Sequence, residues 1–155
     1  MIALDRGHRH DVELTSPWLL AGVKTLSYAV NRSAMREAVH RGADDVIFVS
    51  SNGFVLEGPS STVVYRASDR ILTPGPGLGI LDGTTQAIIF RCAESLGFET
   101  GLAQPSPADL VVADAVWLVS SGRLATPVYR LDGMEMPVDR ELTEQMNTFL
   151  LAVGE

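Results

Sequence analysis

The sequence contains a single cysteine, Cys92, and therefore cannot form an internal disulfide. It also lacks any run of about 18 apolar residues, so no transmembrane helix is expected. Basic residues are in the minority, and the formal net charge is -7. Because nucleic acids and anionic membranes bind basic patches, neither is expected as a partner. The lone cysteine and an N-terminus without an apolar signal-peptide core favour a cytoplasmic location.

What is present fits one globular domain. The chain has 155 residues, of which 46% are hydrophobic and 20% are charged, a balance that supports one sizeable core. Residues 1–18 do not form a convincing independent unit, and we interpret them as an entry segment from a further, N-terminal domain. Residues 19–155 are then the domain that carries the core and the site.

Hydrophobic periodicity predicts an alternation of helices and strands. Helical patterns occupy residues 27–41, 84–96, 107–113 and the segment from 139 onward. Short apolar or β-branched runs predict strands over 2–4, 46–50, 54–57, 62–67, 71–73, 98–102, 116–119 and 126–131. Hairpins mixed with helical crossovers indicate an α/β domain with a mixed sheet.

Two segments have the composition of an anion-binding site. Thr84 and Thr85 open a predicted helix, where unpaired N–H groups and the helix dipole attract anions. Ser121 and Gly122 follow the apolar strand 116–119, and a turn there can bring backbone N–H groups close to an anion. Taken alone, an ordinary threonine cap and an ordinary turn are the more common interpretations.

Lys24 and Glu57 are the candidate reactive groups. Lys24 is the only lysine of the chain, and it stands between the apolar residues Val23 and Leu26. A lysine desolvated in this way is a usable amine nucleophile, whereas the alternative is a surface lysine whose stem lies on apolar neighbours. Glu57 lies on a predicted strand. An exposed position is the default for it, because a buried carboxylate needs a cationic partner.

Several short motifs follow one another in a characteristic order. They are KTLSY at 24–28, GADD at 42–45, EGPSST at 57–62, LTP at 72–74, ILDGTT at 80–85, AD at 113–114 and TPV at 126–128. This order resembles the class IV aminotransferase family of fold-type IV pyridoxal 5'-phosphate (PLP) enzymes, over about residues 19–135. The resemblance implies the large C-terminal domain of the D-amino-acid aminotransferase-like fold, with a mixed, barrel-like sheet and flanking helices. It also implies a homodimer.

The resemblance assigns cofactor roles to four of the candidates. Lys24 matches the lysine that forms a Schiff base with PLP and then moves protons on the substrate carbon. Glu57 matches the carboxylate that pairs with the pyridine nitrogen and so keeps the ring an electron sink. Tyr28 matches a tyrosine that, in some members, hydrogen-bonds the phenolic oxygen of the ring. Leu81 matches the leucine packed on one face of the ring.

The phosphate group is expected where the two anion segments converge. Thr84 and Thr85 match the phosphate site at a helix start, and Ser121 and Gly122 match the second phosphate loop. Arg123 falls where many members have a small residue. A contact to the phosphate or to a substrate carboxylate is one interpretation of Arg123, and a surface salt bridge is the other.

The sequence also departs from the family pattern. Thr62 and Gln86 stand where members usually have asparagine and arginine. Members carry a smaller N-terminal domain that supplies a phosphate-binding arginine and one wall of the substrate pocket, and we expect this chain not to contain it. Arg6 and Arg9 lie too near Lys24 in sequence to replace that arginine.

The residues of these motifs are most similar to those of the aminodeoxychorismate lyase branch of the family. The implied reaction is loss of pyruvate from 4-amino-4-deoxychorismate, which gives 4-aminobenzoate for folate synthesis. A transaminase of branched-chain or D-amino acids is the first alternative, and a folded but inactive truncated domain is the second. Each enzymatic reading implies a small amino-acid-like substrate and no metal.

Overall fold

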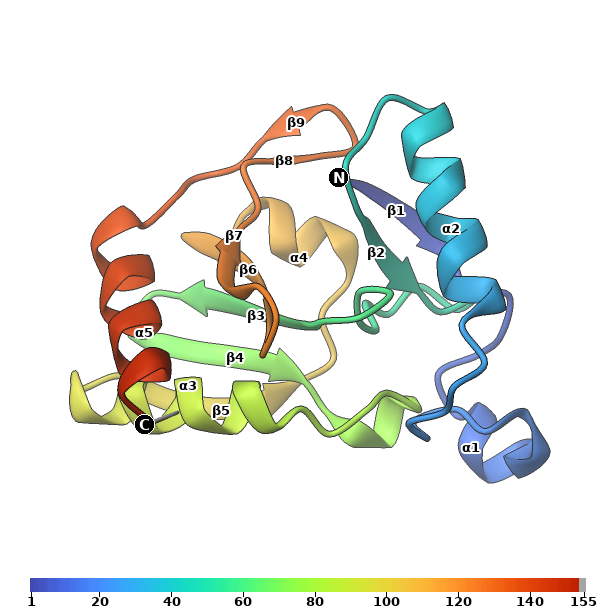
Figure 1. Cartoon of the computed structure of the whole chain (residues 1–155), viewed down its shortest axis with the longest axis horizontal. Helices are drawn as coiled ribbons and strands as arrows, with labels where there is room; N and C mark the ends of the chain where they lie inside the picture. Colours follow the sequence, from blue (N-terminus) through green and yellow to red (C-terminus); the bar gives the residue numbers. More distant parts are fainter. Residues whose placement is uncertain (154–155) are drawn as a thin grey trace.

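The computed structural model describes residues 1–153, and the last two residues of the predicted domain lie outside the described residues. The helices are α1 (Val12–Thr15), α2 (Ala29–His40), α3 (Thr84–Ser95), α4 (Pro107–Val111) and α5 (Arg140–Val153), with short 3-10 turns at Pro17–Leu19 and Pro76–Leu78. The strands are β1 (Ile2–Asp5), β2 (Val46–Val49), β3 (Thr62–Ala67), β4 (Arg70–Pro74), β5 (Glu99–Ala103), β6 (Ala115–Ser120), β7 (Leu124–Pro127), β8 (Arg130–Leu131) and β9 (Met134–Glu135). Figure 1 shows their arrangement.

The central sheet has the strand order β5-β4-β3-β6-β7. Only the β4–β5 pair is parallel, so the predicted α/β class with a mixed sheet is confirmed. The barrel-like closure is wrong for the described chain, in which β1 and β2 pair as a separate parallel sheet and leave β5 and β7 as open edges. The physical reason lies in residues 50–61, which run mainly as turns between β2 and β3 and form only isolated bridges, Val49–Val55 and Gly58–Ser61.

The return of the chain at residues 54–57 is a hairpin with little regular strand. The Phe48 N–H donates to the Glu57 carbonyl at 2.8 Å, and the Leu56 N–H donates to the Phe48 carbonyl at 2.8 Å. Only Val55 forms a bridge there, so the strand predicted over 54–57 is wrong as a continuous element. The hairpin nevertheless anchors the backbone of Glu57 to β2.

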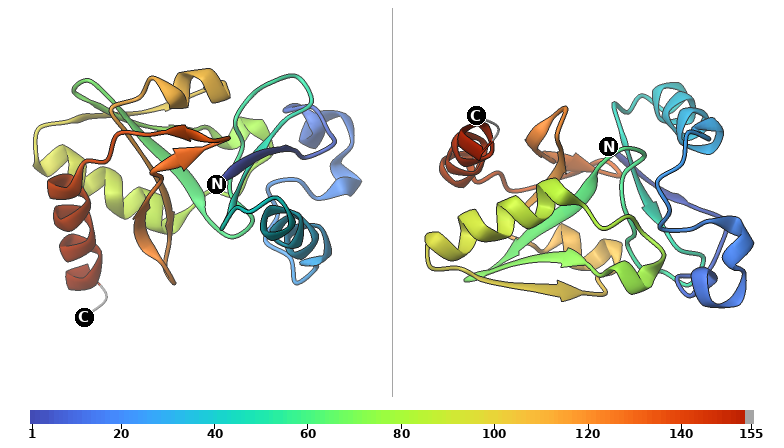
Figure 2. Two further views of the ribbon diagram at one scale, coloured as in Figure 1. Left: turned by 90° about the horizontal axis from the view of Figure 1, so that it is seen from above. Right: turned by 60° about the horizontal axis from the view of Figure 1, so that its bottom comes forward.

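Apolar side chains bury both faces of the central sheet. Because strand residues alternate between faces, Val64 and Trp117 pack toward α3 and α5, while Val63 and Leu118 pack toward α4. Figure 2 shows α3 and α5 beside the sheet. Cys92 lies in the first of these layers with 3% exposure.

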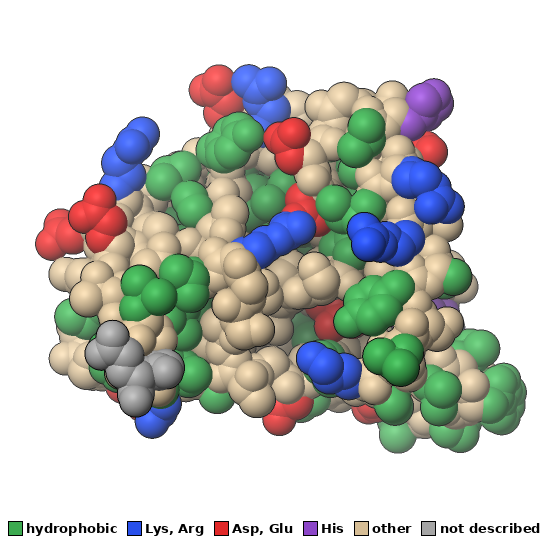
Figure 3. All heavy atoms as spheres, viewed as in Figure 1, with side chains coloured by type: hydrophobic (Ala, Val, Ile, Leu, Met, Phe, Trp, Pro, Cys, Tyr) green, Lys and Arg blue, Asp and Glu red, His purple; other side chains and the backbone are tan. Residues whose placement is uncertain are grey.

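The first 18 residues contribute to this fold. β1 pairs with β2, and the terminal amino group of Met1 donates to the Arg130 carbonyl at 2.8 Å. The division at residue 18 stays a prediction. Around α1 the chain exposes large apolar side chains, a green group at the lower right of Figure 3, which include Leu14, Trp18, Leu19 and Leu20. Every helix within residues 1–153 is too short or too polar to cross a bilayer.

Candidate functional site

Thr62, the first residue of β3, lies between the two predicted anion segments. Thr62 pairs in register with Val119, which lies two residues before Ser121 and the turn that carries Ser121 and Gly122. On its other side, a Cβ added to Gly83 would overlap the Thr62 Oγ1, so the start of α3 lies against this side chain. The structure therefore brings both segments to one end of β3, although they are far apart in sequence.

The start of α3 is uncapped. Gly83 is the N-cap in an extended conformation, and no side chain caps the helix. The first backbone bond is donated by the Ala87 N–H to the Gly83 carbonyl at 3.1 Å. Within residues 1–153 the N–H groups of Thr84 and Thr85 therefore have no protein acceptor, although Thr85 is only 8% exposed. Such N–H groups at a helix start fit an anion.

The turn between β6 and β7 has the same property. Ser121 and Gly122 are both exposed, and their N–H groups find no acceptor among the residues that the structure describes. The adjacent Arg123 N–H donates to the Ser120 carbonyl at 3.2 Å and closes the turn. The turn thus presents free backbone donors near the α3 start, as an anion seat requires.

Arg123 is engaged in an ion pair. The Arg123 Nη1 donates to the Oδ2 of Asp45. Asp45 is only 4% exposed. Of the two interpretations that the sequence allowed, the structure shows a salt bridge, with a buried rather than a surface carboxylate. The sequence analysis missed Asp45 as a partner. Its position directly before the buried strand β2 was the available signal, because a buried carboxylate needs a cation.

Glu57 and Leu81 are in direct contact. The Leu81 N–H donates to the Glu57 Oε2 at 3.2 Å. Burial raises the pKa of Glu57, and this effect is opposed by the Leu81 N–H and by the charge of Arg6. The Arg6 guanidinium lies over the Phe48 ring, 4.3 Å from its centroid. Arg6 is thus a cationic neighbour of Glu57, a pairing that needs the β1–β2 register and was not visible in the sequence.

A glutamine at position 57 is expected to stabilise the cofactor-free chain at pH 7. A carboxyl whose pKa is raised on folding weakens stability as the pH rises from its ordinary pKa of 4.5 toward the raised value. Glu57→Gln cannot ionise, and its amide oxygen still accepts from Leu81. The free energy of unfolding in urea should exceed that of the wild type at pH 7, and the two should converge at pH 4.

Glu99→Gln is the matched control for this comparison, because Glu99 is an exposed carboxylate on β5. Its effect should stay within about 0.5 kcal/mol at both pH values. A Glu57→Gln variant that is less stable than the wild type at pH 7 would show that the attraction of Arg6 outweighs desolvation.

Lys24 and Tyr28 lie on the exposed connection into α2. Tyr28 is the N-cap residue of that helix and is 45% exposed. Of the two environments that the sequence allowed for Lys24, the structure shows the surface one, because Lys24, Val23 and Leu26 are all exposed. The reason is that no other element of the described chain covers this loop. Their cofactor roles stay predictions.

The Lys24 loop nevertheless lies beside the loop that carries Leu81. Gly22 has a φ of +74°, and a Cβ there would stand 3.0 Å from the Ile80 carbonyl oxygen. The main chain just before Lys24 therefore touches the residue just before Leu81. The Leu81 N–H in turn donates to Glu57. Lys24, Leu81 and Glu57, which are all predicted to contact the cofactor, therefore lie on adjacent segments.

Gly83→Ala is expected to destabilise the chain by about 1–3 kcal/mol, the usual cost of overpacking. The backbone of Gly83 (φ -85°, ψ 116°) is allowed for alanine, so the cost arises from overlap with the Thr62 Oγ1. In a Thr62→Ala background most of this cost should disappear. Urea unfolding of the two single variants and the double variant measures the coupling, and strict additivity would contradict the close approach.

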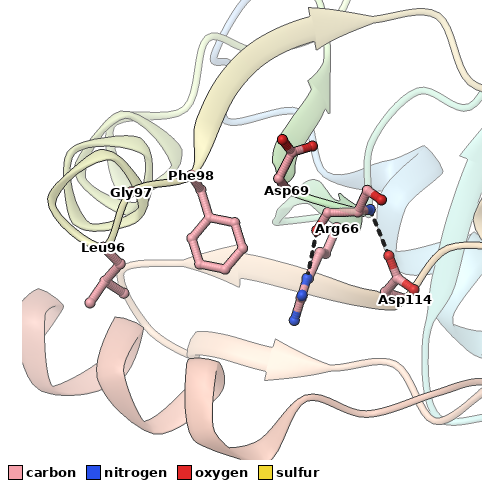
Figure 4. Close-up of a pocket in the computed structure, with 7 residues that line it drawn as sticks. Arg66, Asp69, Leu96, Gly97, Phe98 and Asp114 are labelled. Carbon is pink, nitrogen blue, oxygen red and sulfur yellow. Dashed lines mark hydrogen bonds between the residues drawn. The ribbon is translucent and has the colours of Figure 1, made fainter.

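The hollow drawn in Figure 4 lies at the opposite end of β3. It has a volume of about 350 Å³ and includes Arg66 and Asp114 in its lining. The Arg66 Nη1 donates to Asp139 at 2.7 Å, and its guanidinium lies 5.2 Å from the centroid of the Phe98 ring. This arginine is therefore engaged within the fold, and the candidate site remains at the Thr62 end.

Solved structures match nearly the whole chain. The fold IV-transaminase CpuTA1 from Curtobacterium pusillum is 55% identical with a TM-score of 0.95, and the match covers 99% of this chain and 51% of that one. The PLP-bound form of a hypothetical aminotransferase from Mycobacterium tuberculosis is 43% identical with a TM-score of 0.92, covering 98% of this chain and 55% of that one. The fold of this chain is thus that of the class IV aminotransferases.

The family follows from the sequence comparison. The model of the amino-transferase class IV family matches residues 3–131, and the chain belongs to that family. Among curated proteins it is similar to the bifunctional aminodeoxychorismate lyase / D-amino acid transaminase of Mycobacterium tuberculosis, with 46% identity over 143 residues. That match covers 88% of this chain and 50% of the relative, so the chain spans about half the length of this curated relative.

Proposed function

We propose that this chain is the PLP-binding domain of a class IV enzyme acting on an amino-acid-like substrate. The observation that carries the proposal is the convergence of two sets of unpaired N–H groups on either side of Thr62. The loop that leads into α3 also reaches the carboxylate of Glu57. One end of β3 therefore offers an anion site and a half-buried carboxylate together, and a phosphorylated pyridine needs both.

In this proposal the candidate residues have distinct roles. PLP, when bound, supplies the electron sink for the reaction. The backbone N–H groups of four residues would hold the phosphate, with the dipole of α3 contributing; these are Thr84, Thr85, Ser121 and Gly122. The further arginine that family members use for the phosphate belongs to the smaller domain.

The remaining candidate residues are assigned to the pyridine ring and to the substrate. Glu57, held by the Leu81 N–H, would stabilise the protonated pyridine nitrogen, and Leu81 would contact the ring. Lys24 would hold the cofactor through its amine and would serve as the acid–base group for the proton on the substrate carbon. Tyr28 is assigned to the phenolic oxygen of the ring.

For the reaction itself we propose the aminodeoxychorismate lyase activity, with 4-aminobenzoate and pyruvate as products in folate synthesis. Support comes from the motif wording and from the relative that combines this activity with D-amino acid transamination. D-amino acid transamination is the second candidate on the same ground. We also propose a homodimer and a cytoplasmic location, as the resemblance and the composition imply.

The test uses the purified chain supplied with PLP. Cofactor binding is followed by visible absorbance, and product formation is measured from three substrates: aminodeoxychorismate, D-alanine with 2-oxoglutarate, and leucine with 2-oxoglutarate. Pyruvate together with 4-aminobenzoate from the first supports the lyase. Glutamate formed with D-alanine or with leucine supports the corresponding transaminase. Cofactor binding without turnover supports the truncated, inactive domain, and no binding at millimolar PLP contradicts the proposal.

A further inference from the structure

Asp45 is a buried carboxylate whose two oxygens have different partners. It closes the connection between α2 and β2, and its side chain is 6% exposed. Its Oδ1 accepts from the N–H of Val46, the first residue of β2, at 2.8 Å. Its Oδ2 accepts from the Arg123 Nη1, on a turn 78 residues further along the chain. Asp45 therefore joins the β1–β2 unit to the β6–β7 turn.

The turn that Arg123 occupies has few bonds of its own. The Arg123 N–H bonds to Ser120 at 3.2 Å, and the Arg123 carbonyl accepts from the Thr126 hydroxyl at 3.1 Å. Leu124 has a φ of 59°, a left-handed conformation that costs a branched side chain free energy. The Ser120–Leu124 pair of β6 and β7 closes the turn, and the Arg123 side chain adds a contact to a residue outside the hairpin.

The ion pair also determines how much positive charge Arg123 contributes to the anion seat, the site formed by the free backbone N–H groups. A guanidinium bound to a buried carboxylate is neutralised at close range, so Arg123 adds little net positive charge to the seat. The seat then depends on the backbone donors of Ser121 and Gly122, which act only if the turn stays against Thr62. The position of the turn thus matters more than the charge of its arginine.

We propose that Asp45 is a positioning residue for the cofactor phosphate: through Arg123 it holds the Ser121–Gly122 turn against Thr62 and the start of α3. This inference rests on the proposed function. It predicts a defect confined to the phosphate, because neither Glu57 nor Leu81 is joined to the Asp45–Arg123 pair by a hydrogen bond within the described residues.

The experiment compares PLP with pyridoxal, which lacks the phosphate, as ligands of the full chain. In the wild type, PLP should bind more tightly than pyridoxal. Asp45→Asn should weaken PLP binding about tenfold, near the lower end of what a charge-assisted hydrogen bond contributes, and leave pyridoxal binding within about twofold. Asp44→Asn is the matched control, since Asp44 is exposed and has only a 3.4 Å contact from the Tyr129 hydroxyl. It should change neither affinity.

A double-variant cycle separates positioning from folding. Arg123→Ala should reproduce the selective loss, and Asp45→Asn/Arg123→Ala should lose no more than either single variant. The double variant leaves no buried charge unpaired. Its binding of PLP and pyridoxal can therefore be measured even if a single variant does not fold. Equal losses for PLP and pyridoxal, additive losses, or tighter PLP binding by Asp45→Asn would overturn the inference alone. A wild type that binds neither ligand would overturn the proposed function as well.

Discussion

Replacing Lys24 with alanine is expected to abolish the visible absorbance that the chain acquires with PLP. Lys24 is the only lysine, so no other ε-amine is present to bond to the cofactor. The other primary amine is the terminal group of Met1, which is engaged with the Arg130 carbonyl. Turnover should fall by at least about 100-fold, because the acid–base group is lost together with the covalent link.

Lys24→Arg provides the control for charge. An arginine keeps the positive charge but cannot form the covalent link, so it should be as silent as alanine. Absorbance that persists in both variants would place the reactive amine elsewhere and reject Lys24. Because Lys24 is exposed on its loop, both variants should keep the stability of the wild type within about 0.5 kcal/mol. A loss of absorbance then reports chemistry and not unfolding.

Trp117→Ala is expected to be the most destabilising single substitution considered, at about 3–5 kcal/mol. Trp117 is fully buried on β6, and its Nε1 donates to the Thr143 hydroxyl of α5 at 2.8 Å. The substitution opens a cavity between the sheet and α5 and leaves that hydroxyl without its donor. Since domains of this size are stable by roughly 5–15 kcal/mol, a large part of the total would be lost.

The second tryptophan offers a matched control. Trp18 is 74% exposed beside α1, and Trp18→Ala should change the free energy of unfolding by less than about 0.5 kcal/mol. Urea unfolding followed by circular dichroism measures both variants without relying on the removed fluorophore. Similar effects of the two substitutions would mean that β6 and α5 do not pack as described.

The helices were predictable because their signals are local. A helix was expected at 84–96 and α3 spans Thr84–Ser95, and the segment expected at 27–41 contains α2 at Ala29–His40. Apolar residues at helical spacing form one apolar face of the helix, and this face does not depend on the strand order of the sheet. The two hydroxyl residues at the start of α3 were likewise visible, because they are consecutive in the sequence, whereas the lack of a side-chain cap was seen only in the structure.

The errors share one cause, which is dependence on distant partners. Residues 54–57 have a strand pattern, yet their pairing with β2 is limited to a short hairpin. Val23 and Leu26 are apolar, yet nothing in the described chain covers them. Neither outcome follows from local residue types, because burial depends on which element lies opposite.

By itself the sequence indicated the family, most of the helices and strands, and the residue types available for chemistry: one lysine, a carboxylate and two groups of backbone donors. Only the tertiary structure decided how they are combined. It set Thr62 between the two anion segments, Arg6 near Glu57, and Asp45 against Arg123. These contacts depend on strand order and register, which arise when whole faces of helices and sheets are buried together, and no local pattern specifies them.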